Sequence, residues 1–108
     1  MFDKLENLLL KYEELGARLS QPDAASDPVL FRQLMKEQSD LEPIVSAYIE
    51  YKKAGQTVND SLAMLDEESD EEMRTMLKEE LASARDKITE LEGRLKILLL
   101  PPPDSSFP

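Results

Sequence analysis

The chain has 108 residues, which is enough for one domain, and it contains no histidine and no cysteine. Disulfides, thiol chemistry and the most common general base are therefore excluded. Acidic residues outnumber basic residues by 23 to 13, and a net charge of −10 argues against strong nucleic-acid binding by this chain alone.

The first predicted element is a helix that begins near the N-terminus. Its apolar residues recur at steps of three and four, as one face of a helix requires: Leu5, Leu8, Leu9, Tyr12, Leu15 and Leu19. Asp3 is a candidate N-cap. Turn-forming residues then follow from Ser20 to Pro28, and the pair Asp27-Pro28 predicts an N-cap followed by proline at the first position of the next helix.

The second predicted helix carries a longer apolar stripe. Its members are Phe31, Leu34, Gln38, Leu41, Ile44, Tyr48, Tyr51, Gly55, Val58, Leu62 and Leu65. Pro43 removes one backbone hydrogen bond at a cost of about 3 kcal/mol, so we expect a kink or a short helix–helix junction at residues 41–43. Gly55 lies on the stripe, where it would permit close approach of another backbone.

An acidic run joins the second helix to the third. Residues 66–80 hold eight acidic and two basic side chains. Ser69 followed by Glu72 has the spacing of a capping box, which predicts the start of the third helix. The run lacks the spacing and the turn glycine of an EF-hand, so we interpret it as a solvated turn and not as a calcium site. The third stripe continues to the prolines through Met73, Leu77, Glu80, Ala84, Ile88, Leu91, Leu95 and Leu98.

Together these stripes predict an all-α fold. A short acidic turn near residues 66–70 would make the second and third helices antiparallel, with the first helix packed alongside them. We therefore expect an elongated antiparallel helical bundle, or coiled-coil hairpin, with the second helix kinked near Pro43. Residues 1–100 would form this helical domain, and residues 101–108 a proline-rich, disordered tail.

Residues for catalysis are not found in the sequence. The three glycines are scattered at Gly16, Gly55 and Gly93, so there is no phosphate-binding loop. We predict no catalytic, cofactor-binding or metal-binding residues, no cofactor, and no enzyme activity. No apolar run approaches the roughly 20 residues that span a bilayer and no signal peptide is visible, which indicates a soluble cytoplasmic protein without a membrane contact.

Several ordered stretches resemble one known family. They are "MFDKLENLLLKYEEL", "SDPVLFRQLMKEQSDLEPIVSAYIEYKKA", "EMRTMLKEEL" and "LEGRLKILLLP", which together cover residues 1–101. In this order, around an acidic turn, they are similar to the N-terminal helical domain of the bacterial peptide chain release factor 1 family, the type that reads UAA and UAG.

The resemblance implies a role in translation termination. In that family a tripeptide in one domain reads the stop codon, and a Gly-Gly-Gln loop in another domain supports peptidyl-tRNA hydrolysis. No Gly-Gly pair occurs here, so the resemblance implies a non-catalytic domain that is truncated before both of those domains. The family places this domain toward the stalk base of the large ribosomal subunit, as an accessory contact. The ribosome is thus the implied partner, and the residues that contact it are not identified.

The end of the chain raises a separate expectation. Ile97, Leu98, Leu99 and Leu100 cover the whole circumference of a helix, which is more than one packing seam needs. If further domains normally cover them, this chain would self-associate through these four residues or bury them against its own proline-rich tail. The tail departs from the Pro-Lys-Asp-Pro that the family usually has at this point. A generic coiled-coil scaffold or adaptor protein remains the alternative interpretation.

Overall fold

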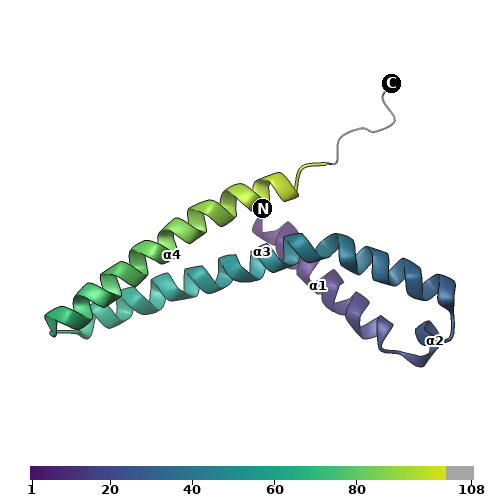
Figure 1. The fold of residues 1–108 in the computed structure, drawn as a ribbon, viewed down its shortest axis with the longest axis horizontal. Coiled ribbons are helices and arrows are strands. Elements are labelled where there is room, and N and C mark those ends of the chain that lie inside the picture. Colours follow the sequence, from purple (N-terminus) through teal and green to yellow (C-terminus); the bar gives the residue numbers. More distant parts are fainter. Residues whose placement is uncertain (102–108) are drawn as a thin grey trace, which may run out of the picture. The chain divides into compact units, whose positions relative to one another are not determined.

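The structure is a computed structural model, and it describes residues 1–101. These residues form four helices and no β-strand: α1 (Phe2–Leu19), α2 (Pro22–Ala25), α3 (Pro28–Glu67) and α4 (Glu71–Leu98). The prediction of an all-α fold is confirmed (Figure 1). Pro101 lies outside any helix, and the rest of the predicted tail, residues 102–108, lies outside the described residues.

The chain divides into two compact units within α3. The first comprises residues 1–48 and the second begins at residue 49. Helix α3 is 40 residues long and contributes its first half to one unit and its second half to the other. Each unit is described separately below.

The core of the first unit forms where α1, α2 and α3 meet. Leu15 of α1, Ala24 of α2 and Leu34 of α3 are buried in one apolar cluster. Half-buried side chains pack against this cluster: Leu19, Leu30 and Leu41. The single turn of α2, which was predicted only as a collection of turn formers, therefore contributes to the core through Ala24.

Polar contacts join α1 to the first half of α3. The Tyr12 hydroxyl donates a hydrogen bond to the Glu42 carboxylate, and the buried Tyr48 hydroxyl donates to Glu6 Oε1 over 2.6 Å. A Cβ atom added to Gly16 would meet Gln38 Nε2 at 3.1 Å, so the two helices approach closely at that glycine. The first helix thus packs alongside the first half of the second helix, and its predicted packing against the hairpin stays a prediction.

One of the two predicted N-caps in this unit is confirmed. Asp27 Oδ1 accepts a hydrogen bond from the Leu30 backbone N–H over 3.1 Å, and Pro28 is the first residue of α3. The prediction for Asp3 is wrong, because α1 begins at Phe2 with Met1 at the N-cap position. Asp3 lies in the first turn, where its charge still favours the positive end of the helix dipole.

Helix α3 continues through Pro43 without interruption. The alternative of a helix–helix junction at residues 41–43 is therefore wrong, and the kink remains a prediction. Proline removes the donor for the carbonyl of Ser39. Because Ser39 and Pro43 are both exposed, water can reach that carbonyl, which lowers the cost of keeping proline inside a helix.

The second unit is an antiparallel hairpin of α3 and α4. Next to the turn, Arg74 donates to the carbonyl oxygen of Leu65 over 2.6 Å, whereas far from the turn Arg94 pairs with Glu50 over 3.7 Å. Contacts farther from the turn therefore join residues with higher numbers in α4 to residues with lower numbers in α3, as in antiparallel helices. The turn comprises residues 68–70, within the predicted range (Figure 1).

The buried seam of this hairpin differs in part from the predicted stripes. Helix α4 buries five side chains: Leu77, Leu81, Ala84, Leu91 and Leu95. On α3, Ser61 is only 2% exposed and Ala54 is buried, whereas Leu62 is 41% exposed. Three residues predicted on the stripes of the hairpin are exposed, Leu62, Met73 and Glu80, and so is Phe31 on the stripe in the first unit. The stripe on α3 was wrong at its end because small residues, Ala54 and Ser61, face the partner helix one heptad apart.

A tyrosine–glutamate hydrogen bond also crosses the second unit. The Tyr51 hydroxyl donates to Glu92 Oε1 over 3.2 Å. Burial raises the pKa of Tyr51, and the nearby Glu92 carboxylate raises it further. In the first unit, the hydrogen bond to Glu42 raises the pKa of Tyr12. All three tyrosines of the chain therefore donate to a glutamate on another helix.

The N-cap of α4 is Asp70 and not Ser69. Asp70 has extended backbone angles, and its Oδ2 accepts a hydrogen bond from the Met73 backbone N–H over 3.0 Å. The backbone N–H of Asp70 donates to Glu68 Oε1, so a glutamate before the helix, and not one inside its first turn, accepts from the backbone N–H of the N-cap residue. Both Ser and Asp are good N-caps, and the helix begins one residue later than the Ser69 spacing predicts.

The interpretation of Gly55 is also wrong. A Cβ atom added at Gly55 would have no heavy atom within 4 Å, so no neighbouring backbone requires a glycine there. Gly55 therefore only adds conformational freedom to the unfolded chain and weakens α3.

We expect Asp70→Ala to lower the free energy of unfolding by about 1 kcal/mol, because the Met73 N–H loses its acceptor. Ser69→Ala is the matched control and should change it by less than about 0.5 kcal/mol. Urea denaturation of the three proteins measures both values. A larger loss for Ser69→Ala than for Asp70→Ala would contradict the cap assignment.

We expect Gly55→Ala to raise the free energy of unfolding by about 0.5–1 kcal/mol, since alanine fits the helix and has open space for its methyl group. Gly16→Ala should raise the free energy of unfolding by less, because the new Cβ atom would press on the Gln38 side chain. Thermal unfolding of both variants tests the ranking. Destabilisation by Gly55→Ala would indicate a close neighbour at that position.

We expect stability to fall at high pH in part because of Tyr51. The pKa of Tyr51 in the folded chain lies above the usual value of about 10, so at pH values below about 10 the neutral phenol stabilises the fold. This contribution is lost as pH rises from about 10 through the raised pKa. Tyr51→Phe should therefore lose less stability than the parent between about pH 9 and about pH 11. Urea titrations at the two pH values measure the difference, and equal losses would contradict it.

Candidate interaction surface

The apolar residues predicted for self-association lie at the end of α4. Ile97 and Leu100 are exposed, whereas Leu98 and Leu99 are half-buried. Helix α4 ends at Leu98, and the backbone N–H of Leu99 donates to the carbonyl oxygen of Leu95. The structure thus leaves two of the four side chains open to solvent, and self-association through them stays a prediction.

The acidic turn is held together by one basic side chain. Arg74 Nη1 donates to the carbonyl oxygens of Leu65, over 2.6 Å, and Glu68, over 2.8 Å. A cation at this position compensates the negative end of α3, where carbonyl groups lack helical partners. Arg74 was not identified from the sequence, although the first basic residue of an acidic run, seven residues after the end of a helix, is a usable signal.

The acidic side chains do not gather into a metal site in the part of the chain that the structure describes. Within residues 1–101, no group of three or more acidic side chains has the arrangement that a metal ion would require. In the same range, no helix is sufficiently long and apolar to span a bilayer.

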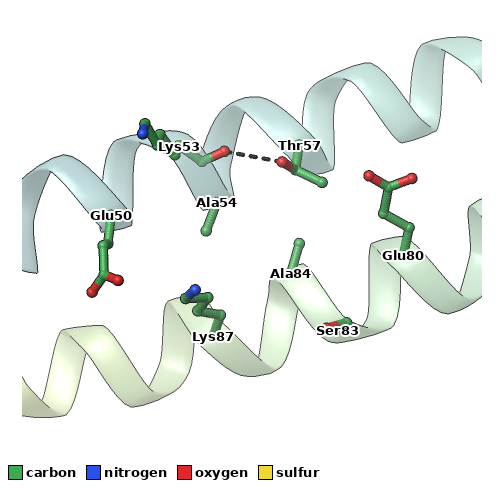
Figure 2. A pocket seen from close by; sticks show the side chains of 8 residues that line it. All are labelled: Glu50, Lys53, Ala54, Thr57, Glu80, Ser83, Ala84 and Lys87. Carbon is green, nitrogen blue, oxygen red and sulfur yellow. Dashed lines mark hydrogen bonds between the residues drawn. The ribbon is translucent and has the colours of Figure 1, made fainter.

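A hollow of about 380 Å³ lies between the two helices of the hairpin. Figure 2 shows Ala54 of α3 and Ala84 of α4 pointing toward each other across it. The other side chains around the hollow are polar or charged: Glu50, Lys53, Thr57, Glu80, Ser83 and Lys87. Two alanines at facing positions fill less space than the leucines elsewhere in the seam, which is the physical reason for the hollow.

The chemistry of this hollow fits binding better than catalysis. The Thr57 hydroxyl donates a hydrogen bond to the backbone carbonyl of Lys53 over 3.1 Å, and a carbonyl cannot act as a base toward it (Figure 2). Glu50, Glu80, Lys53 and Lys87 place two negative and two positive charges around the rim. Such a rim can pair with polar groups of a ligand or of another protein, and the alanines can admit one apolar side chain.

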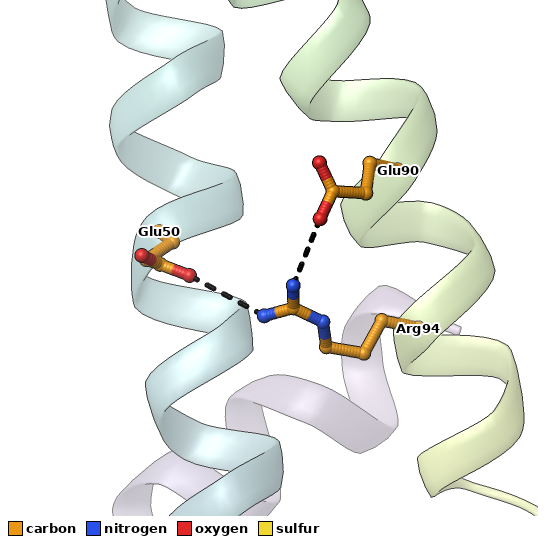
Figure 3. Close-up of polar contacts among 3 residues, drawn as sticks. All are labelled: Glu50, Glu90 and Arg94. Atoms are coloured by element: carbon orange, nitrogen blue, oxygen red, sulfur yellow. Dashed lines mark hydrogen bonds and ion pairs between the residues drawn. The ribbon is translucent and has the colours of Figure 1, made fainter.

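A charged cluster lies at the far end of the hollow from the turn. Arg94 Nη2 donates to Glu90 Oε1 over 2.9 Å, and Arg94 Nη1 lies 3.7 Å from Glu50 Oε2 (Figure 3). All three side chains are in part exposed to water, so each pair contributes about 0.2–1 kcal/mol. The cluster therefore adds little to the stability of the hairpin, and it joins Glu50 at the rim of the hollow to α4.

Neither the hollow nor the charged cluster follows from the stripes of large apolar residues in the sequence. The hollow depends on small residues at matched positions of two helices. The antiparallel pairing could have indicated it, because Ala54 and Ala84 each lie about fifteen residues from the turn and would be opposite each other.

Comparison with known proteins identifies the family. The model of the PCRF domain matches residues 8–106. The chain is 60% identical to peptide chain release factor 1 of Agathobacter rectalis, 50% to that of Lachnoclostridium phytofermentans and 45% to that of Listeria monocytogenes. Each of these matches covers 94% of the chain and 28% of the relative. No solved structure matches the chain.

The chain therefore spans about 28% of the length of the curated relatives that it matches. Its resemblance to the release factor 1 family, first indicated by the ordered stretches on either side of the acidic turn, is confirmed by these comparisons. The family match covers both the first unit and the hairpin. This helical chain belongs to the PCRF domain family.

Proposed function

We propose that this chain is the non-catalytic helical domain of a peptide chain release factor that acts in translation termination in the cytoplasm. The observation that carries the proposal is the 60% identity, over 94% of the chain, to peptide chain release factor 1 of Agathobacter rectalis. A generic coiled-coil scaffold would share the helical periodicity but not this identity, and the 101 matched residues include the turns as well as the helices.

The proposal assigns catalysis to parts of the release factor outside this chain. The chain has no histidine, no cysteine and no Gly-Gly pair. Among the described residues that line the hollow, the one threonine hydroxyl is bonded to a backbone carbonyl. These observations support a binding role, with stop-codon reading and hydrolysis of peptidyl-tRNA carried out by other domains.

The proposed binding role is an accessory contact with the stalk base of the large ribosomal subunit. A net charge of −10 disfavours a contact made mainly to RNA phosphates. The contact would therefore use protein surface with a few basic side chains, and it would be weak without the anchoring domains of the full release factor.

We expect the purified chain to release no peptide from ribosomes stalled at a UAA codon, because the residues for codon reading and water activation are absent. A full-length release factor 1 in the same assay is the positive control. The chain should still bind a stalk-base particle of ribosomal protein and RNA, with a shallow dependence of the dissociation constant on salt.

Two results would contradict the proposal. Hydrolysis of peptidyl-tRNA by the chain would mean that it carries a catalytic site. Absence of binding to the stalk-base particle at millimolar concentrations of the chain would reduce its role to that of a spacer between other parts of the release factor.

A further inference from the structure

Three exposed methionines lie near the turn of the hairpin. Met64 on α3 is 54% exposed, and Met73 and Met76 on α4 are 40% and 62% exposed. They are three of the five methionines of the chain and fall within 13 consecutive residues. Apolar side chains that gather on a surface usually mark an interaction site, whereas isolated ones do not.

The geometry of the hairpin places these methionines on one face. Thr57 and Glu80 line the same hollow from opposite helices. Met64 lies seven residues after Thr57, and Met73 lies seven residues before Glu80. Seven residues are two helical turns, and the helices are antiparallel, so both steps lead along the same face toward the turn. Met76 lies three residues from Met73 and shares that face. We call Met64, Met73 and Met76 the methionine patch.

The rim of the methionine patch is uniformly acidic. On a helix, the residues three or four positions away are the surface neighbours of a side chain. The charged neighbours of the three methionines at these spacings are Asp60, Glu67, Glu68, Asp70, Glu72, Glu79 and Glu80, and no base is among them. The guanidinium group of Arg74, which is adjacent in sequence, is directed at the carbonyls of Leu65 and Glu68.

Several of these carboxylates are open to a partner. Glu68 and Asp70 accept hydrogen bonds from backbone N–H groups of the turn. Glu67, Glu72, Glu79 and Glu80 are exposed. Their negative field would repel nucleic acid and anionic lipid and attract lysine and arginine side chains.

We propose that the methionine patch binds a basic amphipathic helix of another protein. Methionine side chains are flexible and polarizable, so they adapt to apolar residues of different shapes. The acidic rim selects a helix whose flanks carry lysine or arginine. The hollow between Ala54 and Ala84 continues the same face with two lysines and two glutamates at its rim, so it offers space for one more apolar anchor and does not extend the acidic rim. The proposed binding site consists only of side chains of the hairpin. It is separate from the ribosomal contact proposed above, for which no residues are assigned.

The test uses the full 108-residue chain labelled with nitrogen-15 and two synthetic peptides. One peptide has leucine on one helical face and lysine on the other, and the second has the same lysines with every leucine replaced by glutamine. We expect backbone amide shifts confined to the hairpin around the turn and the hollow. The leucine peptide should bind at least about tenfold more tightly than the glutamine peptide by isothermal titration calorimetry.

Substitutions separate the patch from the overall negative charge. The triple variant Met64→Gln, Met73→Gln, Met76→Gln should weaken binding of the leucine peptide by at least about tenfold. Met35→Gln is the matched control, because Met35 is 46% exposed on the part of α3 in the first unit, and it should change affinity less than about twofold. Amide spectra without peptide show whether each variant is folded.

A second pair of variants tests the rim. Glu72→Gln, Glu79→Gln, Glu80→Gln should weaken binding and flatten its dependence on salt. The same number of substitutions at exposed acids of the first unit, Glu13→Gln, Glu14→Gln, Glu37→Gln, changes net charge equally and should have a smaller effect.

Three outcomes would overturn the proposal. Equal affinity for the two peptides, or equal weakening by the two sets of charge substitutions, would reduce the binding to non-specific attraction. Equal weakening by Met35→Gln and by the triple methionine variant would exclude the patch. Concentration-dependent shifts of the patch amides without peptide would identify a second copy of this chain as the occupant.

Discussion

The seam between α3 and α4 is the constraint on which the second unit depends. Helix α4 is 28 residues long, and its five buried side chains follow one stripe. An isolated helix with so many charges is marginal in water, so its stability must come from burial of this stripe. The seam also fixes the register of the hairpin. The position of the turn, the facing alanines of the hollow and the pairing of Arg94 with Glu50 all follow from that register.

The sequence predicted the fold class, the start of α3 and the place of the turn because each depends on local chemistry. Asp27 followed by Pro28 specified the start of α3, and the acidic turn specified the reversal of the chain. The errors arose where two local solutions have nearly equal energy. Ser69 and Asp70 are both good N-caps, and the choice between them depends on where the seam places the first turn of α4. The junction predicted at Pro43 is not formed, because this position is exposed and water can take the place of the missing hydrogen-bond donor.

The candidate surface could be predicted less well than the fold. The hollow requires two alanines, far apart in sequence, to be opposite each other, which only the register of the hairpin determines. The periodicity of large apolar residues predicted Leu62 in the core, whereas the structure buries Ser61. The methionine patch could not be predicted from either helix alone, since its members lie on both sides of the turn.

The three tyrosine–glutamate hydrogen bonds have a consequence for how this chain can be observed. The chain contains no tryptophan, so its near-ultraviolet absorption and intrinsic fluorescence come from tyrosine alone among its strong chromophores. Tyr12 and Tyr48 belong to the first unit and Tyr51 to the second, and each hydroxyl donates to a carboxylate only while its helices are paired. The tyrosine fluorescence of the native chain thus contains one signal from each unit. Single Tyr→Phe replacements would separate the two signals without any attached label.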